Sequence, residues 1–190
     1  MKAVTLIQAL MWLAYPVVIF FGIHYFQPRY IAIILTLLLI FRWRNEAESI
    51  LQGMAQVTIA VFLALLSITT LTAISNSETL LRLYPALVNC GMLLIFSYSL
   101  KYPPSMVERF ARLHDPALTP SGVSYTHRVT QVWCLFFVFN GCFSTYTALY
   151  LSRDEWSLYN GFIAYILMGA MFTGEWIIRR HFIAKNTDNS

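Results

Sequence analysis

The sequence predicts an all-α, polytopic membrane protein, and three observations lead to that fold class. Hydrophobic residues make up 58% of the 190-residue chain and gather in six blocks separated by short polar stretches. Charged residues account for 12%, about half of the ~25% typical of water-soluble domains. The basic residues between the blocks fall unequally on two sides, as expected when one side of a membrane is the cytoplasm.

The first two blocks are predicted to form a helical hairpin. Val4–Phe26 looks like a signal peptide, but its apolar run is too long and no small-residue cleavage site follows, so we expect an uncleaved helix. Pro28–Trp43 is short and covers only ~24 Å as a helix. Pro28 suits a first helical turn and Tyr30–Phe41 carries no charge, which favours a crossing. A re-entrant or interfacial segment, leaving five spans, is the alternative.

The other four blocks form two further hairpins: Leu51–Ile74, Leu83–Leu100, Val129–Leu151 and Trp156–Ile178. A helix needs ~20 residues to cross a ~30 Å hydrocarbon core, and only Leu83–Leu100 among these four is shorter. The six predicted spans make one transmembrane domain over residues 1–182. We expect residues 183–190 to be a disordered tail.

The orientation follows from the lysines and arginines. With six spans, three basic residues lie on one side: Arg29, Arg82 and Arg153. Ten lie on the other: Lys2, Arg42, Arg44, Lys101, Arg109, Arg112, Arg128, Arg179, Arg180 and Lys185. Positive charge marks the cytoplasmic side, so both termini are predicted to be cytoplasmic. The numbers of basic residues on the two sides stay at ten and three with five spans, so charge does not decide between the two topologies.

The longest predicted connection, residues 101–128, is cytoplasmic and begins with an amphipathic helix over residues 104–114. Ser105 and Glu108 have the spacing of a capping box at its start. Its apolar face and its basic face are formed by Met106, Phe110 and Leu113, and by Arg109 and Arg112. We expect this helix to lie on the inner leaflet as a connector, or to be the docking site of a cytosolic enzyme. Residues 114–126 are predicted to be a flexible loop.

Four polar residues in or at the edges of the spans are candidates for binding a substrate. Glu175 stands inside a long apolar run, four residues before Arg179, so the two can pair at the inner interface or form a proton or head-group site. Asn89, Asn140 and Asn160 suit hydrogen bonds between helices. If Asn89 and Asn140 faced each other beside Glu175, the three would form a polar cavity.

Several classes of function are not supported by the sequence. No phosphate loop, nucleophile elbow or metal-ligand spacing occurs, so we expect no enzyme activity, no cofactor and no metal. We attribute the net charge of +4 to basic residues that set the orientation in the membrane, and no basic groove for nucleic acid is predicted. Deep aromatic residues, among them Phe136, Phe137, Phe139 and Tyr146, either pack between helices or line a groove for a flat lipid.

Two resemblances point to a bacterial setting. The stretch Leu83–Asn89, the Trp133, Phe136, Phe137 and Asn140 pattern, and Trp156 after a polar turn resemble the intracellular septation protein A family over residues 50–178. Residues 128–180, from the Trp133 pattern through Gly169 to Glu175, are similar to bacterial inner-membrane proteins encoded beside the fatty-acid-like synthesis enzymes of aryl polyene lipids. These resemblances imply a multi-pass inner-membrane protein of envelope biogenesis and imply no reaction.

Two hypotheses of function follow, with a third less favoured. The first is an accessory protein of envelope or lipid biogenesis that recruits cytosolic lipid-synthesis proteins through the helix at 104–114. The second is a small transporter or flippase-like carrier of a lipid or polyene intermediate that uses Glu175, Asn89, Asn140 and Asn160. The third is a membrane-embedded transferase. The lipid bilayer is the one certain partner, and the sequence does not decide the oligomeric state.

Overall fold

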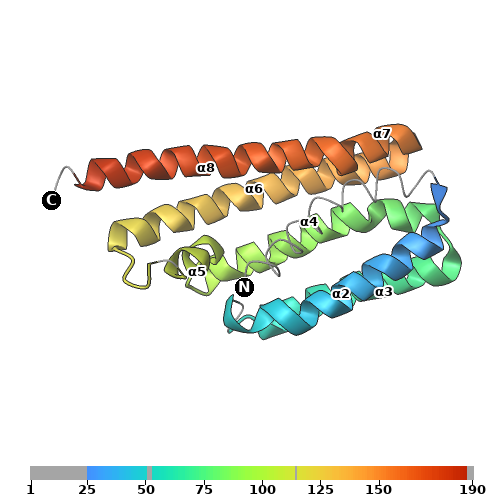
Figure 1. Ribbon diagram of the computed structural model, residues 1–190, viewed down its shortest axis with the longest axis horizontal. Helices are drawn as coiled ribbons and strands as arrows, with labels where there is room; N and C mark the ends of the chain where they lie inside the picture. The colour runs from blue at the N-terminus through green and yellow to red at the C-terminus, as the bar shows by residue number, and fades with distance from the viewer. Residues whose placement is uncertain (1–24, 51–52, 114, 188–190) are drawn as a thin grey trace, which may run out of the picture.

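Helices and their caps divide the chain into the elements seen in Figure 1. The computed structural model describes residues 25–50, 53–113 and 115–187, without the side chains of 41–50 and 181–187. No strand occurs in these ranges. The elements are α2 (Pro28–Ile50), α3 (Ala55–Ser75), α4 (Glu78–Lys101), α5 (Met106–Arg112), α6 (Pro120–Tyr150), α7 (Arg153–Leu158), the π-helix η1 (Tyr159–Ile163) and α8 (Ala164–Thr187).

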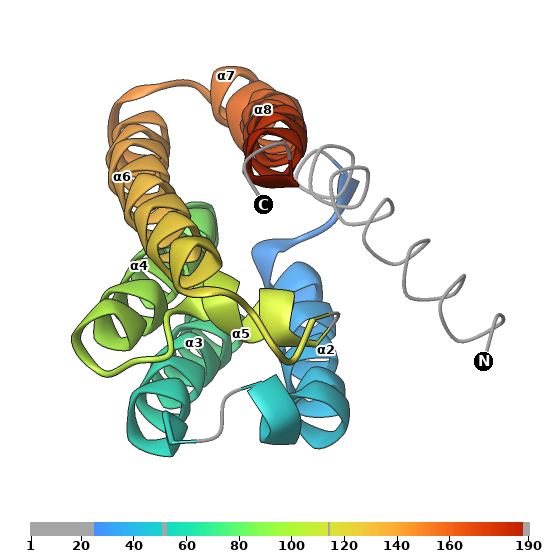
Figure 2. The ribbon, with the colours of Figure 1, turned by 90° about the vertical axis from the view of Figure 1, so that its left-hand side faces the viewer.

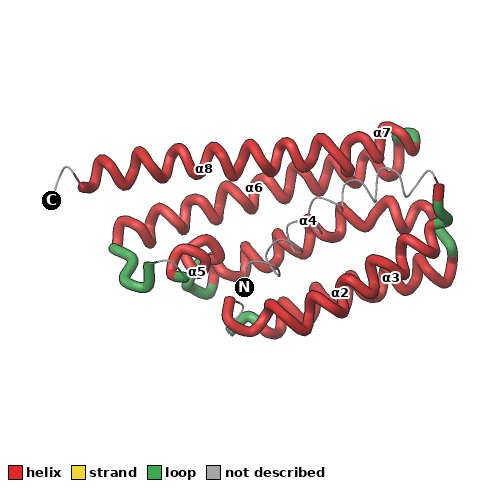
Figure 3. The backbone as a smooth tube through the Cα atoms, viewed as in Figure 1, coloured by secondary structure: helices red, strands yellow, loops and turns green. Residues whose placement is uncertain are grey.

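The long helices run side by side along the long axis of the molecule, so the loops gather at its two ends (Figure 3). One end holds α7, the turn between α3 and α4, and the start of α2; we call it the α7 end. The opposite end holds α5 and the loop that leads to α6; we call it the α5 end. The α5 end is the side predicted to be cytoplasmic. The view along the axis in Figure 2 separates the helices and places α4 between α3 and α6.

Four helical segments in the described part of the chain are long and apolar enough to cross a membrane. They are α3, α4, α6 and the continuous segment from Arg153 to Arg180 that joins α7, η1 and α8. The protein is therefore a multi-pass α-helical membrane protein, as predicted, while the six spans and the cytoplasmic termini stay predictions. The predicted span Val4–Phe26 lies outside the described residues except for Tyr25 and Phe26. The apolar part of α2, Pro28–Ile40, is shorter than the four spans.

The second predicted block is longer as a helix than its apolar residues indicated. It was expected to end at Trp43, but α2 continues to Ile50 and packs along α3. Its first turn is tied to the α7 end, because the backbone amide of Arg29 donates to Oδ1 of Asn76 at 3.1 Å. Asn76 follows α3 and adopts the left-handed conformation at φ 51°, which ends that helix. Residues 28–50 thus run beside α3 from one end of the hairpin toward the other.

Two spans begin earlier than predicted because their caps lie outside the apolar blocks. The fourth block was expected to begin at Leu83, but α4 begins at Glu78, where Ser77 accepts a bond from the amide of Leu80 at 3.4 Å. Residues 120–126 were expected to be loop, but they form the first turns of α6. Thr119 caps this helix through the amide of Gly122 at 3.3 Å, and Pro120 occupies its first turn.

The last predicted block, Trp156–Ile178, is extended at both ends. A capping box starts α7 at Arg153: the amide of Ser152 donates to Oε2 of Glu155 at 2.9 Å, and the amide of Glu155 donates to Oγ of Ser152 at 3.3 Å. At the other end α8 continues to Thr187. The helix therefore reaches past residue 183, where the predicted tail begins.

The interior of the bundle is rich in small polar residues, and its outer surface is apolar. The side chains that are almost completely buried include Thr72, Thr130, Thr147, Ser99 and Ser144. Many leucine, isoleucine and phenylalanine side chains on α3, α6 and α8 are exposed. Membrane helices associate through small and hydroxyl-bearing residues because lipid tails are as apolar as leucine. The distribution of residues therefore agrees with a lipid environment.

The seam along which α6 packs shows this principle most clearly. Its buried residues follow one another in alternating steps of four and three: Thr126, Thr130, Trp133, Phe137, Asn140, Ser144 and Thr147. This spacing averages 3.5 residues and keeps one face against neighbouring helices in left-handed packing. Trp133 and Phe137 join Phe96, Ile95, Met54 and Met106 in the aromatic core. The seam is polar toward both ends and aromatic in its middle.

The contact between α3 and α4 depends on a glycine, and this gives a first prediction. A Cβ at Gly91 would lie 2.5 Å from Cγ1 of Val61, whereas a Cβ at Gly169 on α8 would meet no atom within 4 Å. We expect Gly91→Ala to lower the free energy of unfolding by about 1–3 kcal/mol despite the better helix propensity of alanine. Thermal unfolding of the purified protein in detergent measures this.

The matched control is Gly169→Ala, which should leave stability unchanged or raise it by up to about 1 kcal/mol. Val61→Ala removes the methyl group that a Cβ at position 91 would meet. The double variant Gly91→Ala/Val61→Ala should therefore lose less than the two single variants together. Additive losses would contradict the close approach of α3 and α4 at Gly91.

Candidate functional site

Two of the predicted asparagines meet in the interior, where they join three helical elements. Nδ2 of Asn140 on α6 donates to Oδ1 of Asn89 on α4 at 2.9 Å, and the hydroxyl of Tyr159 on η1 donates to Oδ1 of Asn140 at 2.8 Å. Nδ2 of Asn89 donates to the carbonyl of Pro85 at 2.8 Å. All three side chains are buried. Asn89 and Asn140 therefore face each other, which the sequence raised only as a condition.

The third asparagine forms a second buried layer with residues of α6. Oδ1 of Asn160 accepts a bond from Oγ of Ser144 at 2.6 Å, and its Nδ2 donates to Oγ1 of Thr147 at 3.1 Å. The same Nδ2 group lies 3.0 Å from the carbonyl of Trp156. Ser144 lies four residues after Asn140 on one face of α6, so this layer stacks directly on the Asn89–Asn140 pair. We call the two layers together the asparagine cluster.

The asparagine cluster is positioned by an irregular helical turn. Tyr159 and Asn160 open η1, a π-helix of five residues between α7 and α8. π-helical turns are rare and often occur at functional sites. On the other side of the cluster, Gly141 of α6 packs against Asn89, since a Cβ there would lie 3.1 Å from Cβ of Asn89. The close backbone approach at Gly141 accompanies the bond between Asn89 and Asn140, and η1 brings Tyr159 and Asn160 to their partners on α6.

A half-buried arginine links the asparagine cluster to the α7 end. Nη2 of Arg82 on α4 donates to the carbonyls of Thr147, at 2.8 Å, and Ser152, at 3.3 Å, and also to that of Leu151. Trp156 is buried beside it, and its Nε1 donates to the carbonyl of Arg82 at 2.9 Å. The guanidinium therefore satisfies carbonyls at the C-terminus of α6 and complements the negative end of that helix dipole.

Glu175 is not part of the asparagine cluster, so the predicted cavity of Asn89, Asn140 and Glu175 does not form. The hydroxyl of Tyr125 at the start of α6 donates to the carbonyl of Glu175 at 3.3 Å and to its Oε1 at 3.4 Å. Nε of Arg179 lies 3.7 Å from the same Oε1. Glu175 follows Tyr159 by sixteen residues, which is about 24 Å along a helix. The acid belongs to the α5 end, where Tyr125 joins it to α6. The predicted pair of Glu175 and Arg179 forms within α8.

The second predicted site, the helix α5, is fixed to the bundle by buried hydroxyl groups. The amide of Met106 donates to Oγ of Ser99 on α4 at 2.9 Å, and the amide of Val107 donates to Oγ1 of Thr130 on α6 at 3.2 Å. Ser99 and Thr130 are completely buried. The backbone amides in the first turn of a helix have no partners within that helix. In α5, side chains from two spans accept hydrogen bonds from these amides and thereby hold the first turn in place.

The side chains of α5 divide differently from the prediction. Met106 is 6% exposed and packs in the aromatic core, so it does not share a lipid-facing surface with Phe110 and Leu113, which are 43% and 59% exposed. The reason is the anchoring of the first turn, which pulls position 106 into the bundle while the last turn stays outside. The helix is also shorter than the predicted residues 104–114.

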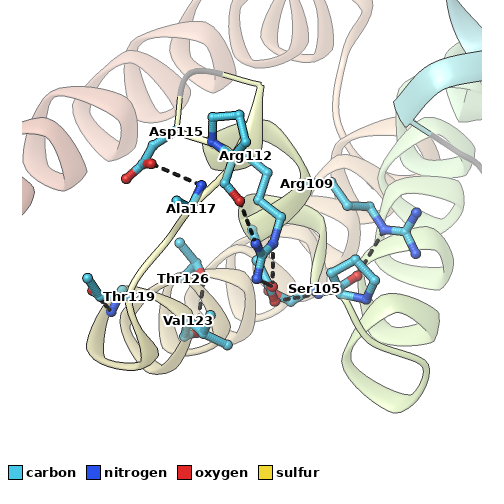
Figure 4. A network of polar contacts seen from close by, with 12 residues as sticks. Ser105, Arg109, Arg112, Asp115, Ala117, Thr119, Val123 and Thr126 are labelled. Carbon is cyan, nitrogen blue, oxygen red and sulfur yellow. Dashed lines mark hydrogen bonds and ion pairs between the residues drawn. The ribbon is translucent and has the colours of Figure 1, made fainter.

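The basic residues of α5 stiffen the segment (Figure 4). Nη2 of Arg112 lies 2.8 Å from Oε1 of the buried Glu108, and its Nη1 donates to the carbonyl of Pro116 at 3.1 Å. Nε of Arg109 donates to the carbonyl of Pro104 at 2.9 Å. The carboxylate of Asp115 accepts a bond from the amide of Ala117 at 3.2 Å. These contacts hold the chain on both sides of α5.

The aromatic groove considered above is not assembled. Phe137 is buried in the core and Phe136 packs against it, whereas Phe139 and Tyr146 are exposed on α6. A cavity lies elsewhere, between α3 and α4, with a volume of about 140 Å³. It is lined by apolar side chains that include Val57, Ala64 and Leu94.

Sequence reasoning missed most partners of the asparagines. Tyr159, Ser144, Thr147 and Arg82 were not singled out, and neither were Ser99, Thr130 and Tyr125. One signal was available, because polar residues of α6 recur in steps of three and four on one face toward both ends of the helix, at Thr126 and Thr130 and at Asn140, Ser144 and Thr147. In a membrane helix, such a polar face indicates the side that packs against other helices.

The described residues contain no group of three histidine, cysteine, aspartate or glutamate side chains placed to hold a metal ion. Comparisons of the chain with protein-family models, with curated proteins and with solved structures each give no match. The assignment of a function therefore depends on the residues and contacts of this chain.

The Asn89–Asn140–Tyr159 chain predicts a measurable loss of stability. Asn140→Leu removes both interhelical bonds and leaves the hydroxyl of Tyr159 and Oδ1 of Asn89 without these partners. We expect the free energy of unfolding to fall by about 1–2 kcal/mol. Thr145→Val is the control, because Thr145 bonds only the carbonyl of Gly141 in its own helix. Equal losses for the two variants in a thermal or denaturant unfolding experiment would contradict this assignment.

The Arg82 contacts predict that lysine cannot replace this arginine. A single ammonium group cannot reach the carbonyls that Nη2 bonds while packing beside Trp156, so Arg82→Lys should cost about 1.5–3 kcal/mol of stability. Arg153→Lys is the matched control, because Arg153 pairs with Glu78 in an exposed position and should lose less than about 1 kcal/mol. The prediction is wrong if the Arg153→Lys variant unfolds at a lower temperature than the Arg82→Lys variant in a thermal unfolding experiment.

Proposed function

We propose that this protein is a non-enzymatic accessory protein of the bacterial inner membrane that works in envelope or lipid biogenesis of the aryl polyene type. In this proposal α5 is the surface on which cytosolic proteins of that process dock. The resemblances of residues 50–178 and 128–180 motivate the biological setting. The anchoring of α5 by Ser99 and Thr130 is the single observation that carries the docking role.

A connector between two spans does not need such anchoring. A flexible loop would join α4 to α6 without buried hydroxyl groups directed at its backbone. Here two spans each contribute a completely buried side chain to the first turn of α5, and Met106 is inserted into the core. The last turn is therefore held in a fixed place with Phe110 and Leu113 exposed. A fixed surface loses little conformational entropy when a partner binds, which favours affinity.

The chemistry of the exposed turn suits a protein partner. Phe110 and Leu113 offer an apolar patch, and a docking surface typically depends on a few such anchors. The guanidinium groups of Arg109 and Arg112 are already bonded to Pro104 and Pro116, so they are oriented before a partner arrives. The asparagine cluster gives less support to a carrier of lipids, because its amide groups bond one another and Glu175 lies at the α5 end.

The docking role predicts the effect of a double substitution in the last turn of α5. Phe110→Asp/Leu113→Asp in the full chain should leave the protein folded and inserted, because both side chains are exposed. It should weaken the docking of cytosolic lipid-synthesis enzymes about tenfold or more, since two apolar anchors are lost. Quantitative proteomics of washed membranes, together with profiles of extractable lipids and pigments in the source bacterium, measures both effects.

The matched control is Ala117→Asp, which adds a negative charge to the same connection without removing an apolar anchor. Met106→Asp is unsuitable because it would place a charge in the core. Deletion of the gene should give the same lipid change as the double substitution. If deletion changes the lipids and the double variant restores them fully, the docking surface is wrong. If deletion changes cell division and leaves the lipids unchanged, the lipid role is wrong.

A further inference from the structure

The α5 end carries three exposed basic side chains on three different spans. Lys101 is the last residue of α4, Arg128 lies in the first third of α6, and Arg180 lies in the second half of α8. All three are exposed. Among the residues that the structure describes, no carboxylate forms an ion pair with any of them. We call these three residues the span-end cations.

Two other arginines at this end differ, because their charge is balanced within the chain. Nη2 of Arg112 lies 2.8 Å from Oε1 of Glu108, and Nε of Arg179 lies 3.7 Å from Oε1 of Glu175. Arg179 directly precedes Arg180 in the same helix, so the contrast does not come from a different surrounding. The span-end cations keep a positive charge that attracts anions from outside the protein.

The span-end cations lie at similar depths on their three helices. Lys101 lies about 35 Å along the helix from the start of α4, Arg128 about 33 Å from the end of α6, and Arg180 about 40 Å from the start of α7. These reference points all belong to the α7 end (Figure 1). A hydrocarbon core is ~30 Å thick, and a bilayer with its head groups is ~40–45 Å thick. Spans that enter the hydrocarbon core at the α7 end therefore bring the three cations into the head-group layer at the α5 end.

Aromatic rings accompany two of the span-end cations and support this depth. Cζ of Arg180 lies 3.8 Å from the centroid of the Trp176 ring, and Nζ of Lys101 lies 5.5 Å from the centroid of the Tyr102 ring. Both rings are exposed. Tryptophan and tyrosine are enriched at the boundary between lipid and water. A guanidinium group that stacks on a ring keeps the N–H groups at its edge available, and these can bind two oxygens of one phosphate.

We propose that the span-end cations bind the phosphate groups of anionic phospholipids in the leaflet at the α5 end. Basic residues beside a span attract anionic lipids. The cations lie on α4, α6 and α8, which occupy different positions around the bundle in Figure 2, and a layer of head groups surrounds all three helices. A protein partner is matched better by α5, whose exposed anchors lie in one turn. The lipid is thus a partner in addition to the proteins that the proposed function places on α5.

Native mass spectrometry of the purified full chain tests the proposal. The protein is released from detergent micelles that contain equal amounts of phosphatidylglycerol and phosphatidylcholine, and the bound lipids of each kind are counted. We expect the unchanged chain to retain several times more phosphatidylglycerol than phosphatidylcholine. The variant Lys101→Gln/Arg128→Gln/Arg180→Gln should lose this preference and stay folded, because all three side chains are exposed.

Two control variants separate charge at these positions from other effects. Arg128→Lys/Arg180→Lys keeps both charges and should keep most of the preference. Glu175→Gln/Arg179→Gln removes a balanced pair from the same end and should keep it as well. The proposal is overturned if the unchanged chain shows no preference, if the triple glutamine variant keeps it, or if the balanced-pair variant loses as much. It is also overturned if the triple variant instead loses cytosolic proteins from washed membranes, which would assign the cations to an acidic protein.

Thermal unfolding provides a second measurement that does not depend on lipids surviving in the gas phase. A ligand that binds the folded state raises the unfolding temperature. Added phosphatidylglycerol should therefore raise the unfolding temperature of the unchanged chain more than that of the triple glutamine variant, whereas phosphatidylcholine should affect both alike. Equal shifts with phosphatidylglycerol would contradict the assignment of the head groups to the span-end cations.

Discussion

A bilayer core contains no water to satisfy a buried hydrogen-bonding group, and the arrangement of this bundle follows from that constraint. Each polar group that the sequence places inside needs a partner on another helix or within its own. Asn89 and Asn140 bond each other, Tyr159 donates to Asn140, and Asn160 bonds the hydroxyl groups of Ser144 and Thr147 on α6. The carbonyls at the end of α6 receive Arg82, and the amides at the start of α5 receive Ser99 and Thr130. These bonds fix which helices touch and in which register.

The helix α6 organises the molecule because it takes part in most of these bonds. Its pairing with α4 is the most extensive between two elements, and the asparagine cluster lies on this contact. The last segment depends on α6 in another way. Its α7 end is held by the asparagine cluster, while farther along α8 contacts α6 through side chains such as Phe172, whose ring centroid lies 4.7 Å from that of Trp133. The segment is thus held by polar bonds at η1, by aromatic contact at Phe172 and by the bonds of Tyr125 to Glu175 farther along.

The sequence predicted the fold class well, because apolar blocks and charge measure the environment of each segment directly. It predicted helix ends poorly, because α6 begins at Pro120 and α4 at Glu78, outside their apolar blocks. Capping residues determine where a helix begins, whereas an apolar block shows only which residues are expected to contact lipid. The contact between Asn89 and Asn140 could be raised as a hypothesis from the sequence. The distance between Glu175 and these asparagines could not, because residue spacing within one helix does not reveal how deep a residue lies relative to residues of another helix. Met106 was wrongly predicted to be exposed with Phe110 and Leu113. Periodicity shows which residues share a helix face, but it does not show which other elements cover that face.

The bond from Arg29 to Asn76 has a consequence for how the chain is made. The first turn of α2 receives its partner from a residue 47 positions later, in the turn that follows α3. During synthesis, α2 therefore leaves the ribosome before Asn76, whose side chain accepts a hydrogen bond from its first turn, has been added to the chain. The hairpin of α2 and α3 can finish only when the chain has returned to the α7 end and turned toward α4. The packing of α2 beside α3 is in this sense completed late, with Asn76 as its closing contact.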